Sequence, residues 1–345
     1  MTTGAAHGGR WQSVWPYAGA AALAAGLLAA LVAAVGGDVL GALGALVRAS
    51  FGTLGGVGQT LNKVVPLLLG SLAVVLGMRG GVFNIGVDGQ IYAGAVTATG
   101  LALAAPGLPG AVALPVALVA GLAGGAAWAA LPALLRARYA VSEIFVTVML
   151  NFIALFGVEY LSTGPWNDPM AGEAITRPIA RAYQLPLLLP QGGAHAGILL
   201  AVLAAVVVWA LLYRTVLGYE IRATGDNPSA ARLGGIPVEG TTALVLVLSG
   251  ALAGLAGAVE VTGFHHRLIL GLSPGYGVMS ILIAVLGRRT VPGAVVGSVL
   301  FAVLVVGSDS LQRSAGLPAS AVFVLQAAIL LFLLAAEGIR ARRRA

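Results

Sequence analysis

Long apolar runs recur along the whole chain and restrict its fold more than any other feature. Hydrophobic residues fill 59% of the 345 positions and charged residues fill 9%. Soluble domains carry about 25% charged residues, so this chain has too little charge to cover a soluble globule, and lipid must be its main solvent. A bilayer core needs roughly 20 apolar residues per helix. The ten candidate spans are residues 17–35, 64–78, 90–105, 111–134, 142–162, 196–213, 241–262, 276–287, 293–311 and 319–337.

Arginine residues orient these spans. Of the 19 basic residues, only Lys63 is a lysine, and most arginines sit at the ends of apolar runs. Because cytoplasmic loops carry the excess of basic residues, we expect both termini in the cytoplasm and an even number of crossings. The pI of 10.2 therefore reports orientation rather than nucleic-acid binding. The expected topology of this single domain (1–345) has a cytoplasmic N-terminal tail (1–16), an outer loop (163–195), a cytoplasmic loop (214–240) and a basic cytoplasmic tail (338–345).

The predicted fold is an all-α integral membrane protein. Five spans on each side of residues 163–195 make two inverted five-helix halves, an arrangement that is common in transporters. The second, third and eighth spans are short and interrupted by glycine, which predicts broken or re-entrant segments. Eight or nine true crossings with re-entrant pieces are therefore the alternative to ten crossings. Residues 38–58 are expected to be amphipathic or re-entrant, and the run 17–35 is long enough to be a retained helix rather than a signal peptide. The 50 glycines suit close helix packing in lipid.

The first polar interruption is Arg79-Gly80-Gly81-Val82-Phe83-Asn84-Ile85-Gly86-Val87-Asp88-Gly89-Gln90. Non-helical backbone at membrane depth persists only where protein or a water-filled cavity satisfies it. The stretch is therefore either a broken helix beside a transport path or a glycine-rich turn in the cytoplasm, and its spacing alone favours neither.

A second stretch, residues 141–154, begins a helix. Ser142 is expected to cap it, and Glu143 suits the positive N-terminal end. Asn151 lies more than two turns further on, where a buried amide must find hydrogen-bond partners. It either lines a path or bonds a neighbouring helix.

The third stretch, residues 218–236, is the longest polar loop. Asn227 and Pro228 predict the start of a short helix, with a knob of Ala230, Ala231 and Leu233 between Arg222 and Arg232. A short helix of this kind can insert into a groove of a partner, while the alternative is a solvated turn.

These stretches resemble motifs of the permease subunits of ABC importers for nucleosides and simple sugars, within the branched-chain amino acid and ribose-type permease superfamily. Residues 81–90 match the signature Gly-x-Phe-Asn-Ile-Gly-x-(Glu/Asp)-Gly-Gln, with Asp88 where Glu is more usual. Residues 142–154 and 218–232 are similar to two further motifs of the family. Residues 273–288 are similar to a fourth, with Val278 in place of the usual aromatic residue.

The resemblance implies an importer subunit that carries a nucleoside, or a related simple sugar, across the bacterial cytoplasmic membrane. It implies a second permease chain, identical or homologous, an ABC ATPase subunit that binds ATP and Mg, and an extracytoplasmic substrate-binding protein. The chain itself is expected to bind no cofactor or metal. The expected path residues are Phe83, Asn84, Asp88, Gln90 and Asn151. The expected ATPase-coupling residues are Gly218, Glu220, Arg222, Gly225, Asn227, Pro228, Ala230, Ala231 and Arg232.

Two other classes compete with this interpretation. A self-contained secondary transporter or channel needs no ATPase, and it gives no reason for the coupling-loop match. An intramembrane enzyme needs acidic or histidine residues clustered at one depth, which the sparse acids do not suggest. The only lysine, Lys63, is followed by Val64, so the chain lacks a P-loop for ATP.

Overall fold

A computed structural model of the protein describes residues 39–314 without a gap, together with scattered residues between 19 and 33 and between 324 and 339. In chain order its elements are α3 (Val39–Phe51), α4 (Leu54–Arg79), α5 (Val87–Ala104), α6 (Gly110–Tyr139), α7 (Glu143–Thr163), a 3-10 turn (Arg181–Tyr183), β1 (Leu187–Leu189), β2 (Ala194–His195), α8 (Gly197–Arg214), α9 (Val216–Asp226), α10 (Pro228–Leu233), α11 (Val238–Val259), a π-helical turn (Glu260–His265), α12 (Tyr276–Leu286) and α13 (Val291–Ser314).

The predicted all-α class is confirmed, apart from the small β1–β2 pair. Within the described part of the chain, six helical segments are long and apolar enough to cross a membrane: Leu54–Arg79, Gly110–Tyr139, Glu143–Thr163, Gly197–Arg214, Val238–His265 and Val291–Ser310. The expected spans 90–105 and 276–287 correspond to the helices α5 and α12. The expected spans 17–35 and 319–337 lie largely outside the described residues. Ten crossings and two inverted halves therefore stay predictions.

The second expected span is not short. Helix α4 is continuous over 26 residues and begins ten residues before the apolar run that predicted it. Its first turns carry glycine and polar side chains, which lowered the apolar signal there. The segment expected to be amphipathic or re-entrant, residues 38–58, contains α3 and the start of α4.

The chain divides into two units, residues 61–301 and the remainder. In the unit formed by residues 1–60 and 302–345, Ser50 joins α3 to α13, because its Oγ donates to the carbonyl of Val303 over 3.3 Å. The Thr60 Oγ1 donates in turn to the carbonyl of Ser50 over 3.2 Å. All the features described below belong to the unit of residues 61–301.

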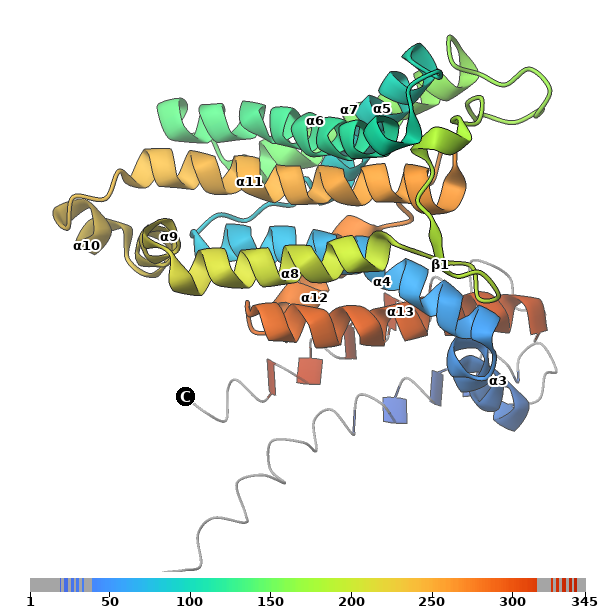
Figure 1. Ribbon diagram of the computed structural model, residues 1–345. Coiled ribbons are helices and arrows are strands. Elements are labelled where there is room, and N and C mark those ends of the chain that lie inside the picture. The colour runs from blue at the N-terminus through green and yellow to red at the C-terminus, as the bar shows by residue number, and fades with distance from the viewer. Residues whose placement is uncertain are drawn as a thin grey trace, which may run out of the picture. The chain divides into compact units, whose positions relative to one another are not determined.

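Glycines bring α5, α6 and α11 into backbone contact. A Cβ added to Gly254 of α11 would lie 2.3 Å from the carbonyl oxygen of Gly121, and one added to Gly125 of α6 would lie 2.2 Å from that of Gly250. Figure 1 shows α6 and α11 running side by side along most of their length. Small residues permit this approach in lipid, where close packing replaces the hydrophobic effect between helices.

Two interruptions break the helical pattern inside this unit. Residues 80–86 connect α4 to α5 without helix, and Gly81 has a φ of +76°. The second interruption precedes α12, where Gly271 and Gly275 both have positive φ and the following helix is only 11 residues long. The short eighth span was expected from the sequence, and residues 80–86 belong to the stretch for which a broken helix and a glycine-rich turn were the two alternatives.

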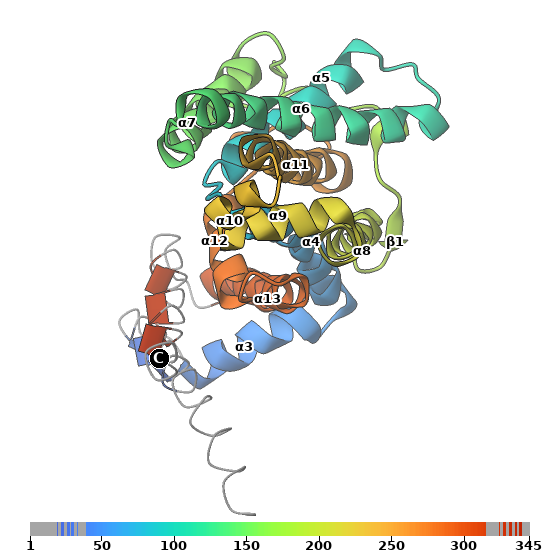
Figure 2. The ribbon, with the colours of Figure 1, turned by 90° about the vertical axis from the view of Figure 1, so that its left-hand side faces the viewer.

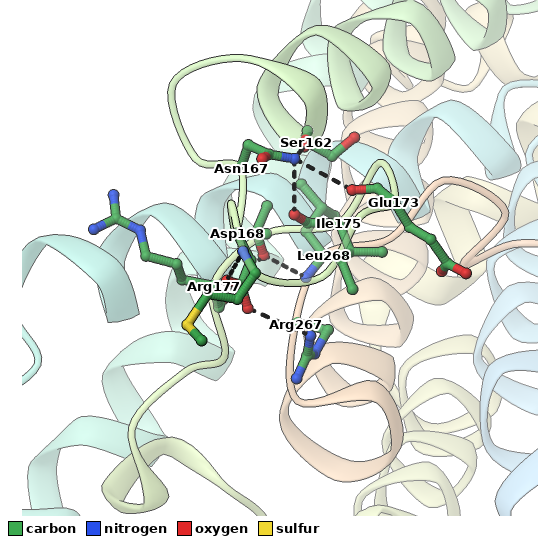
Figure 3. Close-up of polar contacts among 10 residues, drawn as sticks. Ser162, Asn167, Asp168, Glu173, Ile175, Arg177, Arg267 and Leu268 are labelled. Carbon is green, nitrogen blue, oxygen red and sulfur yellow. Dashed lines mark hydrogen bonds and ion pairs between the residues drawn. The ribbon is translucent and has the colours of Figure 1, made fainter.

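The segment between α7 and α8 is tied to the residues that follow the π-helical turn. The backbone N–H of Thr176 donates to the carbonyl of Leu268 over 3.0 Å, and that of Ile179 donates to His266 over 2.9 Å. The Asp168 Oδ2 and the Arg267 Nη1 lie 3.9 Å apart, and the Asn167 amide donates to the carbonyl of Ser162 (Figure 3). These contacts fix the loop across the end of α11.

Helices α9 and α10 lie at one end of this unit, and the β1–β2 pair lies at the other (Figure 1). Figure 2 views the first end directly, with α9 and α10 in front. We call it the arginine end, because α4, α6, α8 and α10 have basic residues in their last turns there: Arg79, Arg136, Arg138, Arg214 and Arg232.

Candidate functional site

Two buried amides brace the connection between α4 and α5. The Asn84 Nδ2 donates to Gln90 Oε1 and to Ser249 Oγ, both over 2.8 Å. Its Oδ1 accepts from the Gln90 Nε2 over 3.1 Å and from the backbone N–H of Gly86 over 3.0 Å. Ser249 Oγ donates onward to the carbonyl of Ala73. Both amides are buried and face one another in this conformation, so they hold the broken segment against α11 and α4.

Asn151 holds the same segment from α7. Its Oδ1 accepts from the backbone N–H of Gly89 over 2.8 Å, and its Nδ2 donates to the carbonyl of Ile85 over 3.0 Å. Irregular backbone inside an apolar body needs partners of this kind. Of the two alternatives open from the sequence, the contact with a neighbouring element is the one observed. A role for Asn151 in lining a path stays a prediction.

Asp88 joins the two interruptions. Its Oδ1 accepts from Ser273 Oγ over 2.6 Å and from the backbone N–H of Gly277 over 2.8 Å. Gly277 belongs to the first turn of α12, where unpaired backbone N–H groups attract negative charge. A carboxylate of α5 thus caps a half-length helix from outside. Membrane transporters often have broken helices with this arrangement near their ligand sites.

We expect Asp88→Ala to lower the free energy of unfolding by about 1.5–3 kcal/mol, because two hydrogen bonds to a charged acceptor are lost and the Gly277 N–H is left unpaired. Asp88→Asn keeps an oxygen acceptor and is the matched control, with a smaller loss. Thermal unfolding of the purified protein in detergent measures both. Equal unfolding temperatures for the two variants would show that the capping contact contributes little.

Glu143 is a site residue whose role the sequence did not reveal. It is 7% exposed, its Oε1 accepts from the backbone N–H of Phe83 over 3.3 Å, and its Oε2 lies 3.4 Å from the Arg136 Nε. The prediction that Ser142 caps α7 is wrong, since Ser142 occupies the N-cap position without a side-chain hydrogen bond. Glu143 instead connects α6 to the broken segment. Two arginines at the end of the preceding helix were the only sequence signal for this pairing.

Phe83 itself is half-buried in this segment. Of the five expected path residues, the structure brings Asn84 and Gln90 together, and Asn151 holds the backbone of Ile85 and Gly89. These three support the broken segment, whereas Asp88 connects α5 to α12.

The expected coupling loop is mostly helical. Thr215 caps α9 through its Oγ1, which accepts from the Gly218 N–H over 3.0 Å. Asn227 caps α10, its Oδ1 accepting from the Ala230 N–H over 3.0 Å, and Pro228 is in the first turn. The prediction of a short helix beginning at these two residues is confirmed.

Gly225 seats α9 on the broken segment. A Cβ added there would lie 2.1 Å from the carbonyl oxygen of Arg79 and 2.9 Å from the backbone nitrogen of Gly81. Arg222 joins α9 to α8. Its guanidinium donates to the carbonyl of Leu212, and its Cζ lies 5.4 Å from the centre of the Tyr213 ring. Helix α9 is therefore fixed to α4 and α8.

The exposed surface of α10 differs from the expected knob. Ala231 is 5% exposed and faces the rest of the chain, whereas Leu233 is 91% exposed. Ala230 and Pro228 are exposed, Gly218 is buried and Glu220 is half-buried. Arg232 pairs with Glu239 on the surface. Leu233, rather than Ala231, is thus the protruding apolar side chain of α10.

A cavity of about 640 Å³ lies beside α10, between the end of α6 and the broken segment. It has a mixed polar and apolar lining, in which Arg136, Arg138 and Arg232 supply positive charge and Glu239 supplies negative charge. The cavity and α10 form one continuous surface at the arginine end.

The other end of the unit holds a buried acid. Glu260 is 1% exposed, and its Oε2 lies 3.4 Å from the His265 Nε2. His195 is also buried, with its ring packed against Gly197 and Gly263. Burial lowers the pKa of His195, and Glu260 opposes this shift, so desolvation favours the neutral ring.

Membrane-length helices, two interruptions joined by Asp88, and an exposed helical pair at the arginine end define a multi-pass membrane permease. A family model described as the permease component of the branched-chain amino acid transport system matches residues 56–334, and the chain belongs to this family. It is a transport subunit of an ABC importer, not an enzyme.

Three relatives cover most of their own length and of this chain. The chain is 35% identical to the guanosine ABC transporter permease protein NupP of Bacillus subtilis, over 92% of this chain and 91% of that protein. It is 36% identical to the glucose ABC transporter permease protein TsgB13 of Haloferax volcanii, over 92% of this chain and 85% of that protein. It is 30% identical to the nucleoside ABC transporter permease protein NupB of Lactococcus lactis, over 82% of this chain and 80% of that protein.

Proposed function

We propose that this permease imports a nucleoside and that α9 and α10 transmit the movement of an ABC ATPase to it. The observation that carries the coupling part is the rigid seat of α9 on residues 79–81 through Gly225, with Leu233 exposed on the adjoining α10. A short helix with one apolar side chain fits a groove on a partner. Force applied to α10 passes through α9 directly to the broken segment.

The nucleoside cargo is favoured by the relatives. Two of the three described above are named for guanosine or nucleoside transport and one for glucose. A simple sugar is therefore the second candidate. We propose that the ATPase subunit, not this chain, binds ATP and Mg.

The arginine end is the cytoplasmic end in this proposal. The Arg79 guanidinium donates to the carbonyl of Arg289 over 2.7 Å, which brings a further basic pair to that end. Basic residues gathered at one end support an orientation with both termini in the cytoplasm. The ATPase would dock there, and an extracytoplasmic substrate-binding protein would dock at the end that carries β1 and β2. A second permease chain, identical or homologous, pairs with this one to complete the channel. Each chain contributes about ten transmembrane helices, arranged in two inverted halves.

We expect Leu233→Arg to reduce co-purification of the ATPase subunit by about 30-fold, the loss that follows from removing one interface hot spot and adding a charge. Leu187→Arg is the matched control, because Leu187 is 51% exposed in β1 at the opposite end. The measurement is the amount of ATPase recovered with detergent-purified permease. Equal recovery with both variants would place the ATPase elsewhere.

A further inference from the structure

Lys63, the only lysine of the chain, lies in helix α4. Its Nζ donates to the Tyr276 hydroxyl over 2.9 Å and lies 5.1 Å from the centre of the Phe264 ring. No carboxylate of the described residues forms an ion pair with it. An ionised group inside a membrane helix is costly, and where it persists it usually serves a function.

The three residues come from the places where helices are irregular. Phe264 belongs to the π-helical turn at the end of α11, and Tyr276 is the first residue of the short helix α12. Turns of the π type occur frequently at functional sites. The next residue, Gly277, is the one that Asp88 caps. The cluster therefore lies beside the interruption before α12, which Asp88 links to α5.

The half-buried Lys63 ammonium lies away from the arginine end. Sixteen residues of α4 separate Lys63 from Arg79, which is about 24 Å of helix. In a hydrocarbon core of about 30 Å, this position is in the half remote from α9 and α10. A ligand entering from that side meets Lys63 before it meets the broken segment.

The chemistry of the cluster selects a ligand type. An ammonium has three donors and no acceptor, and Tyr276, which is fully buried, uses one of them. Lys63 and Phe264 are both half-buried, so they keep an accessible side. A flat ring with neighbouring hydrogen-bond acceptors fits a cation beside an aromatic ring.

Among nucleosides, a 6-oxopurine has such an edge. Its O6 and N7 are adjacent acceptors that Lys or Arg binds, whereas adenine presents an N6 donor there. The hydroxyls of a sugar both donate and accept hydrogen bonds, so an ammonium distinguishes one sugar from another less well. On the basis of the proposed nucleoside import, we propose that Lys63, Phe264 and Tyr276 form a subsite for the carbonyl edge of a 6-oxopurine nucleoside.

The test compares two substrates in the complete transporter. Proteoliposomes with permease, ATPase and one fixed preparation of binding protein take up guanosine or adenosine, and KM is measured for wild type, Lys63→Met and Lys63→Arg. Because every variant is measured with the same binding protein, the contribution of that protein to KM is the same in each. We expect Lys63→Met to raise the guanosine KM about ten- to a hundredfold, the effect of one charged hydrogen bond. The adenosine KM should change less than about twofold, and Lys63→Arg should retain most of the discrimination.

Several outcomes would overturn the subsite. A Lys63→Met transporter with a lower maximal rate for both nucleosides and unchanged KM values would show that Lys63 only joins α4 to α12. If Lys63→Met fails to assemble, Tyr276→Phe releases the ammonium while keeping the ring, and an unchanged guanosine-to-adenosine KM ratio there would also refute the subsite. Uptake of glucose and of neither nucleoside by wild type would instead refute the nucleoside import itself.

Discussion

Replacing Gly254 with alanine is expected to lower the free energy of unfolding by about 3 kcal/mol, the upper part of the range for overpacked interiors. The new Cβ would meet the carbonyl oxygen of Gly121 at 2.3 Å and the Cα of Gly125 at 2.7 Å. Both obstacles are backbone atoms of α6, so no side chain can rotate aside. The methyl group fits only if α6 and α11 separate along their shared face.

Gly157→Ala makes the same chemical change in α7 and is the control. No atom lies within 4 Å of a Cβ added there, and alanine in a helix is favoured over glycine by about 0.5–1 kcal/mol. Thermal unfolding in detergent should therefore show a lower midpoint for Gly254→Ala and an equal or higher one for Gly157→Ala. Equal midpoints for both variants would mean that the α6–α11 contact tolerates an added methyl group.

Apolar runs predicted the positions of most described helices because a helix in lipid exposes its side chains to hydrocarbon on most sides. Helices α6, α7 and α8 show this, and each starts within a residue or two of the predicted span. The signal weakens where a helix carries glycine and polar side chains. The first turns of α4 contain glycine and Gln59, so the apolar run that predicted the span began only at residue 64.

The polar residues of the broken segment could be found from the sequence, but their partners could not. Asn84 stands out because it interrupts an apolar pattern, yet its partner Ser249 is 165 residues away and belongs to an unremarkable helix. No local spacing encodes such a contact. The sequence therefore located the site and left open whether each side chain faces a ligand or another helix.

Glu260 shows a different limit. Its partner His265 follows five residues later, a spacing that places two side chains on different faces of an α-helix. In the π-helical turn the backbone hydrogen bonds join residues five apart, as between the His266 N–H and the Val261 carbonyl, and the side chains of Glu260 and His265 meet. The α-helical period of 3.6 residues per turn therefore does not predict this pair.

Gly225→Val is expected to separate ATP hydrolysis from transport. The side chain would have to occupy the space of the Arg79 carbonyl and the Gly81 nitrogen, so α9 must move off the broken segment while α10 keeps its exposed face. In the proposed mechanism the ATPase still docks on α10 and hydrolyses ATP. We expect the ratio of nucleoside imported to ATP hydrolysed to fall about 5- to 150-fold, the usual size of a coupling between two sites.

Gly240→Val is the matched control for this change. Gly240 lies in the first turn of α11, and the nearest atom to an added Cβ there is 3.9 Å away, on Pro237. Uptake of labelled guanosine and phosphate release are measured on the same proteoliposomes, so the ratio is independent of protein yield. A Gly225→Val transporter with the ratio of wild type would show that α9 does not transmit the movement. A fall in the ratio of nucleoside imported to ATP hydrolysed in both variants would show that any larger side chain at the arginine end disturbs docking. Gly225 would then have no special part in coupling.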